Sequence, residues 1–337
     1  MQIFKIAILL VSLFSSQQAL ARKHMQIVGS STLYPFTTII AEEFGLNTEF
    51  VTPIVESTGT GGGIKLFCSG VGKNYPDFVN ASRKIKDSEI FDCHKNGIKS
   101  VNEIKIGYDG IVLANDKAAR DLNLTQKQIF LALARDIPLN GKLTANPYQK
   151  WSDIDKRLPN SRIAIYGPPS TSGTRDAFVE LVMEKECANL AEFIAKYPDE
   201  KVRKKTCHII RSDGHFIEAG ENDNLIVQKL KNDQDAIGIF GFSFLQQNSR
   251  LIKAVKIDKI EPNFDNIASG KYKISRPLFI YFKKEHLNLV PGMEEFIKEI
   301  INPETIGPEG YLIQKGLIAM PVREFLEVRK KVISLIK

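Results

Sequence analysis

The sequence lacks several features that would assign it at once to a familiar class of protein. Beyond its first 21 residues it has no long apolar run, so nothing there is typical of a membrane-spanning helix. It has no basic stripe with interleaved aromatic residues, and its Lys and Arg residues are scattered among many acidic ones. A face for nucleic acid is therefore not predicted. The net charge of +7 indicates only a general preference for anionic partners.

Motifs for catalysis are also missing. There is no Gly-x-Ser-x-Gly elbow, and the five histidines lie without an obvious orienting carboxylate. The glycines at Gly59 and Gly61 fail as a dinucleotide fingerprint because Ile64 stands where a third glycine is needed. They also fail as an ATPase phosphate loop, since no Ser or Thr follows Lys65. We therefore expect no catalytic residue, no cofactor and no enzyme activity.

What is present at the start of the chain is the pattern of a secretory signal peptide. Lys5 precedes an apolar run over 6–14, and Ala19-Leu20-Ala21 supplies the small residues of a cleavage site. Cleavage after Ala21 would leave 316 residues (337 minus 21), and loss of Lys5 would lower the net charge from +7 to +6. No cysteine that would carry a lipid anchor lies near this point. We expect a soluble periplasmic protein, large enough for two lobes.

The four cysteines do not have the spacing of a metal site. Two of them precede histidines, but neither Cys-x-x-Cys nor His-x-x-x-His occurs, so no metal is predicted. An even number of cysteines in an exported chain favours disulfide bonds, and three pairings are possible. We favour Cys68–Cys93 and Cys187–Cys207 because each closes a local loop, worth roughly 3 kcal/mol in the chain-entropy model.

Strand and helix patterns alternate along the mature chain, which predicts an α/β architecture with mostly parallel sheets. Strand-like runs end repeatedly in loops of small and hydroxylated residues, and such loops open several of the helices. The predicted strands are 25–28, 49–55, 77–80, 104–114, 162–166, 208–212, 236–244 and 278–282. The predicted helices include 125–134, 151–158, 176–186, 294–301 and 322–336.

One loop, Ser170–Arg175, has the composition of an anion site. It lies between the predicted strand 162–166 and helix 176–186. The first amides of a helix have no intrahelical partner and carry partial positive charge, the hydroxyls add donors, and Arg175 offers a bidentate fork. Taken alone, the stretch is better explained as a plain N-cap at the start of an ordinary helix. Three similar loops also end predicted strands, however, and ligands in such sheets gather at strand carboxyl ends. Donors without a base indicate a binding protein.

Taken in order, these motifs resemble those of the periplasmic phosphate-binding proteins of ABC importers, which are two-lobed (type II) periplasmic binding proteins. The resemblance covers most of the mature chain, and Ala81-Ser82-Arg83 is similar to the signature of one subgroup. The matching stretches are Gly29–Pro35, Glu56–Lys65, Ala81–Arg83, Thr171–Arg175 and Gly220–Asn224.

The resemblance implies one lobe over 26–106 and 258–337, a second over 107–257, and a ligand cleft between them. It implies a monomer that binds inorganic phosphate through hydroxyls, helix N-terminal amides and two arginines facing each other across the cleft. Membrane subunits of an ABC importer would receive the closed form. The implied phosphate ligands are Ser31, Thr32, Leu33, Thr60, Ser82, Arg83, Ser172, Gly173, Thr174 and Arg175.

Two departures from the family pattern concern selectivity. Arg83 stands where some members have an aspartate that accepts the proton of monohydrogen phosphate, so the acceptor must lie elsewhere, with Asp223 and Glu56 as candidates. Pro168 and Ser170 stand where other members have an arginine and an aspartate. Sulfate carries no such proton, so an acceptor separates the two anions. Alternatives are a receptor for sulfate or a phosphonate, a secreted phosphate-ester hydrolase, and an adhesin on the same fold.

Overall fold

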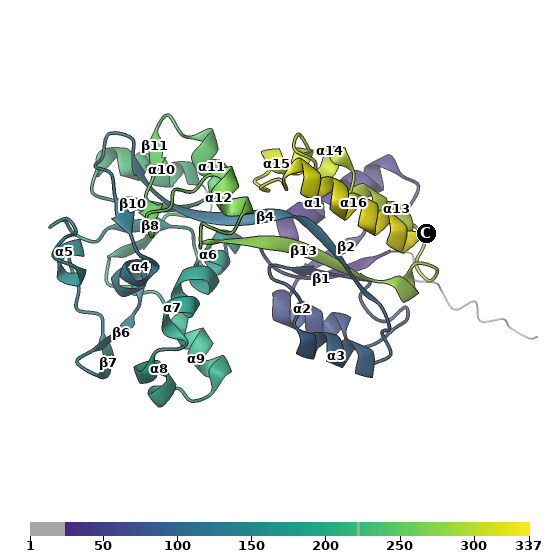
Figure 1. The fold of residues 1–337 in the computed structure, drawn as a ribbon, viewed down its shortest axis with the longest axis horizontal. Coiled ribbons are helices and arrows are strands. Elements are labelled where there is room, and N and C mark those ends of the chain that lie inside the picture. The colour runs from purple at the N-terminus through teal and green to yellow at the C-terminus, as the bar shows by residue number, and fades with distance from the viewer. Residues whose placement is uncertain (1–23, 221–222) are drawn as a thin grey trace, which may run out of the picture.

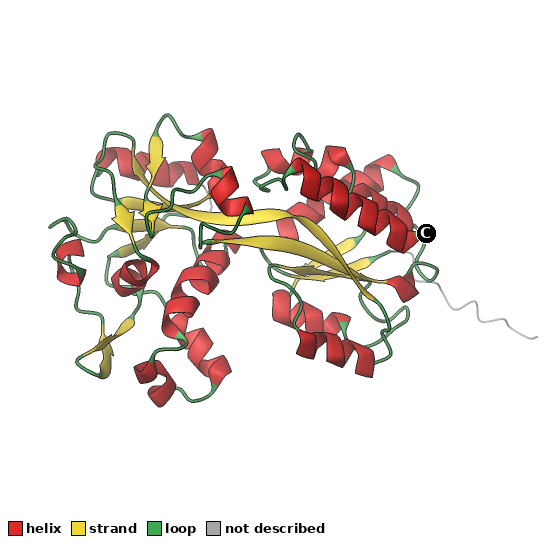
Figure 2. Cartoon of the chain, in the orientation of Figure 1, coloured by secondary structure: helices red, strands yellow, loops and turns green. Residues whose placement is uncertain are grey.

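A mixed sheet runs the length of the molecule, and helices cover it in two groups (Figures 1 and 2). The computed structural model describes residues 24–220 and 223–337; the predicted signal peptide and Glu221 and Asn222 lie outside these residues. The strands of the large sheet follow the order β2 (Ile54–Ser57), β1 (Gln26–Gly29), β3 (Phe78–Ala81), β13 (Ser275–Lys283), β4 (Val101–Asp116), β10 (Ile237–Gly241), β8 (Ile165–Gly167) and β9 (Phe216–Glu218), with β11 (Ile252–Ala254) beside β4.

The two ends of this sheet are parallel and its middle is antiparallel. β1 pairs in parallel with β2 and β3, and β8 pairs in parallel with β10 and β9. β4 and β13 pair with each other, and with their outer neighbours β10 and β3, in antiparallel fashion. The α/β prediction is therefore confirmed. The antiparallel centre arises because β4 and β13 carry the chain between the two halves in opposite directions (Figure 1).

Short helices account for most of the remaining chain. In the first half they are α1 (Tyr34–Asn47), α2 (Thr60–Phe67), α3 (Asp87–Lys95), α13 (Met293–Ile300), α14 (Pro303–Ile306), α15 (Tyr311–Gln314) and α16 (Val322–Ile336), with a 3-10 turn, η2 (Lys284–His286). In the second half they are α4 (Gln126–Leu133), α5 (Trp151–Ile154), α6 (Gly173–Phe178), the π-helical η1 (Val179–Glu184), α7 (Lys185–Cys187), α8 (Ala191–Lys196), α9 (Glu200–Cys207), α10 (Asp223–Asn232), α11 (Phe242–Gln247) and α12 (Phe264–Ala268).

Two small ribbons complete the second half. One pairs β5 (Asn123–Leu124) with β12 (Lys256–Ile257) in parallel, and the other pairs β6 (Asp136–Leu139) with β7 (Lys142–Ala145) in antiparallel fashion. In Figure 1 the elements from β5 to α12 lie on the left and the remaining helices on the right. The lobe boundaries at residues 106 and 258 stay a prediction.

Local sequence rules explain the elements that were predicted well. The Thr125 hydroxyl accepts a hydrogen bond from the Gln128 amide at 3.1 Å, and the Gln128 side chain accepts one from the Thr125 amide at 2.9 Å, which is the capping box that starts α4. In α1, Ile40 and Phe44 are buried, and Phe44 packs edge-on against Phe296 of α13 at 5.2 Å between ring centroids. This packing holds α1 beside α13.

The predicted strand over 208–212 is wrong. The segment instead wraps the buried Arg211, whose guanidinium binds the Asp213 carboxylate and the Tyr148 carbonyl, the latter at 2.8 Å. Ile210 makes only an isolated bridge to Ala134, and the strand of this region is β9. A buried guanidinium needs hydrogen-bond acceptors around it, which favours an irregular backbone over a sheet.

Two other strand boundaries were placed wrongly. The strand predicted over 49–55 begins only at Ile54, because Pro53 has no amide hydrogen to give to a neighbouring strand. The strand predicted over 236–244 ends at Gly241, and Phe242 and Leu245 then bury their side chains from helix α11. Apolar residues suit either element, so the boundary was not visible in the sequence.

Both favoured disulfide bonds are present in the structure. Cys68–Cys93 joins the end of α2 to α3, and Cys187–Cys207 joins the end of α7 to the end of α9. Each therefore stays within one half of the molecule. No helix in the described ranges 24–220 and 223–337 is both long and apolar enough to cross a membrane.

Candidate ligand-binding cleft

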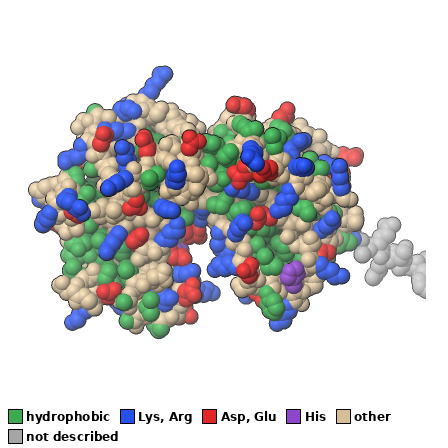
Figure 3. All heavy atoms as spheres, viewed as in Figure 1, with side chains coloured by type: hydrophobic (Ala, Val, Ile, Leu, Met, Phe, Trp, Pro, Cys, Tyr) green, Lys and Arg blue, Asp and Glu red, His purple; other side chains and the backbone are tan. Residues whose placement is uncertain are grey.

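The carboxyl ends of the parallel strands meet between the two halves. β1 ends at Gly29, β8 ends at Gly167 and β10 ends at Gly241, and each is followed by residues that line one cavity of about 520 Å³. In the space-filling view a notch separates the halves in the lower part of the molecule, and Lys and Arg are dispersed over this face together with Asp and Glu (Figure 3). The cavity is lined by Ser31, Thr32, Tyr34, Pro35, Phe36, Asp109, Thr171, Ser172, Gly173, Thr174, Asp223, Gly241, Ser243, Phe244, Gln247, Gln314, Lys315 and Gly316.

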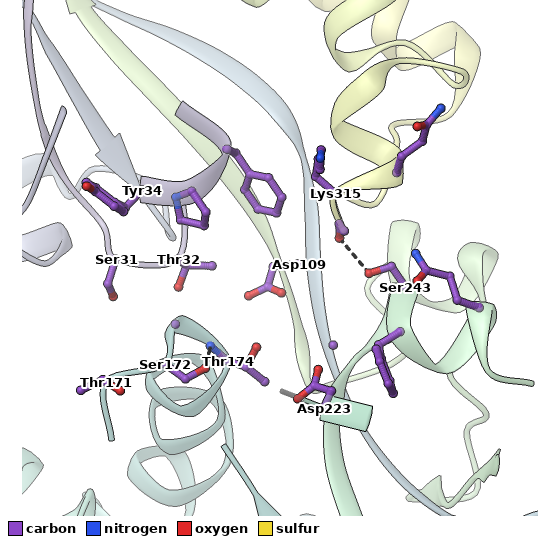
Figure 4. A pocket seen from close by; sticks show the side chains of 18 residues that line it. Ser31, Thr32, Tyr34, Asp109, Thr171, Ser172, Thr174, Asp223, Ser243 and Lys315 are labelled. Carbon is purple, nitrogen blue, oxygen red and sulfur yellow. Dashed lines mark hydrogen bonds between the residues drawn. The ribbon is translucent and has the colours of Figure 1, made fainter. Parts of the chain in front are cut away.

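The first loop is fixed by a glycine whose place no other residue could take. Gly29 has φ +132°, and a Cβ there would lie 2.2 Å from the Asn80 carbonyl oxygen of β3. The Ser30 amide donates to that same oxygen at 2.9 Å. The Leu33 amide donates to the Ser30 carbonyl at 3.2 Å, and the Leu33 side chain is buried. The turn thus directs Ser31 and Thr32 toward the cavity (Figure 4).

The loop predicted from Ser170–Arg175 faces that first loop directly. The Ser172 hydroxyl caps α6 by accepting from the Thr174 amide at 3.2 Å. A Cβ on Gly173 would lie 3.2 Å from Thr32 Cα and 3.3 Å from the Ser31 carbonyl oxygen, so only a small residue lets the backbones approach this closely. The structure therefore brings Ser31, Thr32, Ser172, Gly173 and Thr174 together at the cavity (Figure 4).

Two carboxylates of the second half bind groups of the first loop and of β13. The Ser31 hydroxyl donates to Asp176 Oδ2 at 2.5 Å. Glu180, four residues further along, accepts a hydrogen bond from Arg276. Side chains four residues apart share a helix face, so both carboxylates point the same way. These contacts hold the two halves together across the cleft.

Arg276 is a buried arginine that contacts several residues near the cavity, and the sequence did not predict it as a site residue. It lies on β13, is 8% exposed, and donates from Nη2 to the Thr32 hydroxyl at 2.9 Å. Its Nε lies 3.5 Å from Asp109 Oδ2, and Asp109 stands directly opposite it on β4. The sequence signal that could have found it is a single arginine next to the predicted apolar strand 278–282. Such an arginine is buried only when it has a charged or polar partner.

Asp109 was also missed, although Asp109-Gly110 interrupts a long extended run. Burial raises the pKa of the Asp109 carboxyl above its ordinary value, and the guanidinium of Arg276, which favours the ionised form, offsets this only in part. Its carboxyl group points into the cavity, near the labelled Thr32 and Thr174 in the view (Figure 4).

Thr60, at the start of α2, and Ser82, directly after β3, contact each other and do not belong to the cavity lining. The Thr60 and Ser82 hydroxyls lie 3.0 Å apart, and the Ser82 amide donates to Thr60 Oγ1 at 3.2 Å. Arg83 makes a two-pronged ion pair with Glu89 of α3, at 2.7 and 2.8 Å. Its guanidinium is thereby turned toward α3.

Arg175 is likewise held inside its own half. The guanidinium carbon lies 4.3 Å from the centre of the Phe216 ring, and Nη1 donates to the Pro168 carbonyl at 3.2 Å. Glu218 lies 3.7 Å from Nη1. Burial lowers the pKa of Arg175, with Glu218 opposing that effect. Neither Arg83 nor Arg175 belongs to the cavity lining, and their placement across the cleft stays a prediction.

The two predicted proton acceptors occupy different surroundings. Asp223, at the start of α10, lines the cavity, whereas Glu56 is an exposed residue of β2 outside the lining. Over residues 24–220 and 223–337, no three His, Cys, Asp or Glu side chains gather as metal ligands. What the cavity offers is a set of hydroxyl and amide donors beside Asp109, Asp223 and Lys315.

Two halves joined by crossing strands, with a polar cavity between the strand ends, define a two-lobed ligand-binding protein. Comparison with protein families agrees, since residues 15–304 match the model of the PBP superfamily domain. The chain belongs to this superfamily.

Two named proteins and one crystal structure are similar to this chain. Protein SphX of Synechococcus elongatus is 30% identical over 287 residues, which are 83% of this chain and 74% of that protein. The phosphate-binding protein PstS of Staphylococcus saprophyticus is 29% identical over 314 residues, 91% of this chain and 84% of that protein. A crystal structure of a possible phosphate binding protein from Planctomyces limnophilus has a TM-score of 0.74 and 27% identity, covering 93% of this chain and 99% of that one.

The fold alone is shared with more distant structures. An ABC-type phosphate transport receptor from Vibrio cholerae has 18% identity and a TM-score of 0.60, covering 88% of this chain and 100% of that chain. The predicted two-lobed α/β fold is confirmed by these comparisons.

Proposed function

We propose that this chain is a periplasmic receptor that binds inorganic phosphate between its lobes and delivers it to the membrane subunits of an ABC importer. The observation that carries the proposal is the contact of two hydroxyl-bearing loops, one from each half, at the carboxyl ends of parallel strands. The relatives named as phosphate-binding proteins span most of this chain. The receptor acts without catalysis, as a monomer exported by the predicted signal peptide.

In this proposal the anion is held by donors from both halves. Ser31, Thr32 and the Leu33 turn would serve from the first loop, and Ser172, Gly173 and Thr174 from the facing one. Thr60, the first residue of α2, and Ser82, which follows β3, lie together and would complete the set. Arg83 and Arg175 would reach the anion only after leaving Glu89 and Glu218. Hydroxyl and amide donors around a buried anion make charge-assisted hydrogen bonds, which are the strong ones.

Titration calorimetry of the mature protein with phosphate and with sulfate tests the proposal. We expect one phosphate site and much weaker binding of sulfate. Thr174→Val, which keeps the shape but removes the hydroxyl, should weaken phosphate binding about tenfold or more. Thr38→Val is the matched control, because the Thr38 hydroxyl donates to the Tyr34 carbonyl on the exposed side of α1. If the protein does not bind phosphate, the proposed receptor function is wrong. If it binds both anions equally, the assignment of phosphate as its ligand is wrong.

A further inference from the structure

Helix α16 lies on the outside of the first half, at the upper right of Figure 1, and is firmly attached to it. Its inward side is apolar, and Phe325, Val332 and Ile336 are buried there. Glu324 adds a polar anchor, because its carboxylate accepts a hydrogen bond from Lys105 of β4 at 2.5 Å. The side chains on the outward side of α16 therefore project from a helix whose position is fixed.

The outward side of α16 combines exposed aliphatic residues with basic ones. Val322 is 58% exposed, and Leu326, one turn later, is 54% exposed. Spacings of three and four residues place further residues of both kinds on this face. We call the whole set the α16 stripe: Val322, Leu326, Arg329, Lys330, Ile333 and Lys337.

No other element takes part in the surface that the α16 stripe forms. Two shallow hollows lie along it, and all the residues that line them belong to α16. In Figure 3 basic and hydrophobic side chains adjoin, together with some acidic ones, over the region where Figure 1 shows this helix. The stripe is thus the bare, convex side of a single helix.

The charges on this side of α16 are mostly positive and mostly unpaired. Arg323 pairs with Glu327 at 3.1 Å, and both side chains are largely exposed. The three cations of the stripe, Arg329, Lys330 and Lys337, form no ion pair with any residue of the described ranges 24–220 and 223–337. Unpaired cations gathered on one surface attract an anionic partner.

An anionic lipid surface fits this combination better than other anionic partners. Cations contact lipid headgroups while neighbouring aliphatic side chains reach the boundary of the acyl chains. Nucleic acid strands stack their bases on exposed aromatic rings, and the one aromatic residue of α16, Phe325, is buried. A folded protein would need a matching groove for a convex helix, whereas mobile headgroups rearrange around it.

We propose that the α16 stripe binds the surface of an anionic phospholipid membrane. Its cations contact the headgroups, and Val322 and Leu326 reach the acyl boundary. The inference goes beyond the proposed function and does not depend on it, because no residue of the stripe lines the cavity. Such a contact is reversible and keeps the protein close to the membrane while the cavity lining is untouched.

Sedimentation of the mature protein with vesicles tests the proposal. Vesicles of phosphatidylcholine with about one third phosphatidylglycerol should bind the protein, and vesicles of phosphatidylcholine alone should not. Binding should weaken as salt is added, because the Debye length falls from about 30 Å at 0.01 M to about 10 Å at 0.1 M. Inorganic phosphate should release no more protein than chloride of the same ionic strength, since the partner is a lipid surface and not the free anion.

Paired substitutions test the charges of the stripe. A Lys or Arg near an anionic membrane contributes about fivefold to binding, so Arg329→Gln with Lys330→Gln should weaken it roughly 25-fold. The matched control is Lys201→Gln with Lys205→Gln, which removes the same charge from two exposed side chains of α9. It should change binding by no more than about twofold, because distant exposed charges are screened.

A serine substitution tests the aliphatic part of the stripe. Leu326→Ser should weaken vesicle binding severalfold while its salt dependence stays the same, because only apolar contact is lost. Leu46→Ser is the control, since Leu46 is 81% exposed at the other end of the first half's surface, on α1. All these side chains are exposed, and thermal unfolding of each variant checks that the fold is retained.

Three outcomes overturn the inference. They are equal binding to both kinds of vesicle, an equal loss from the α9 pair and the α16 pair, and no binding to either vesicle, which would leave this face to an acidic protein. None of them touches the proposed function, because titration of the α16 variants with phosphate should match the wild type. A protein that binds anionic vesicles but no phosphate would instead contradict the proposed function alone.

Discussion

At the scale of single residues, Arg83 shows how a neighbouring side chain decides where a charge points. Glu89 holds its guanidinium by two short hydrogen bonds and also accepts from the Lys86 amide at 2.9 Å. Burial alone would raise the pKa of Glu89, but the hydrogen bonds from Arg83 and Lys86 outweigh it and the pKa is lowered. Glu89 is thus ionised in the folded protein to a lower pH than in the unfolded chain.

The sign of this shift gives a prediction for Glu89→Gln. A carboxyl with a lowered folded pKa stabilises the protein above its unfolded pKa of about 4.3, and that contribution is lost as the pH falls through the folded value. Urea unfolding should therefore show the variant less stable than the wild type near neutral pH and equal to it in acid. Asp87→Asn, an exposed change in the same helix, is the control. A difference that persists unchanged in acid would contradict the prediction.

The residues of the candidate site differ in how far the sequence could place them. Five site residues lie in the loops that follow β1 and β8, so local chain geometry sets their positions. The structure brings these five together at the cavity: Ser31, Thr32, Ser172, Gly173 and Thr174. The orientations of Arg83 and Arg175 depend on acceptors elsewhere. Asp109 and Arg276 meet only through strand pairing between residues 167 positions apart (276 minus 109). No local pattern indicates such a pair.

At the scale of elements, the helix predicted over 176–186 is an α-helix interrupted by a π-helical segment. α6 gives way to the π-helical η1, which continues into α7. Such widened turns occur often at functional sites, and here the widened turn carries Glu180 to Arg276. Phe178, Leu181 and Val182 are buried along this helix.

Elements defined by local chemistry were predicted well and those defined by distant partners were not. The basic helix α16 was predicted with the bounds that the structure has, and the capping box predicted α4. The antiparallel centre of the sheet and the irregular segment around Arg211 depend on residues far away in the sequence. Sequence patterns carry little information about such pairings.

The disulfide bond Cys187–Cys207 gives a prediction for the helices that it joins. Replacing both cysteines by alanine should lower the free energy of unfolding by roughly 3 kcal/mol, because a loop of about this length is released in the unfolded chain. Limited proteolysis should then cut first between residues 188 and 206. The matched variant without Cys68–Cys93 should be cut in the other half instead. An unchanged stability would contradict the prediction.

At the scale of the whole molecule, a ligand held between the halves should stabilise both. At a phosphate concentration of about 100 times the dissociation constant, mass action adds about 2.7 kcal/mol to the free energy of unfolding. The melting temperature should therefore rise when phosphate is added, and it should not rise with sulfate at the same ionic strength. Thr174→Val should need more phosphate for the same shift. An equal shift from both salts would show a general salt effect and not a bound ligand.

The pairing of β4 with β13 has one further consequence. The two strands form the ribbon that joins the halves, and Asp109 and Arg276 are opposite each other within that ribbon. A movement of one half relative to the other would be carried through this ribbon, because it joins the two halves. The buried Asp109–Arg276 pair therefore links the electrostatics of the cavity wall to the connection between the halves.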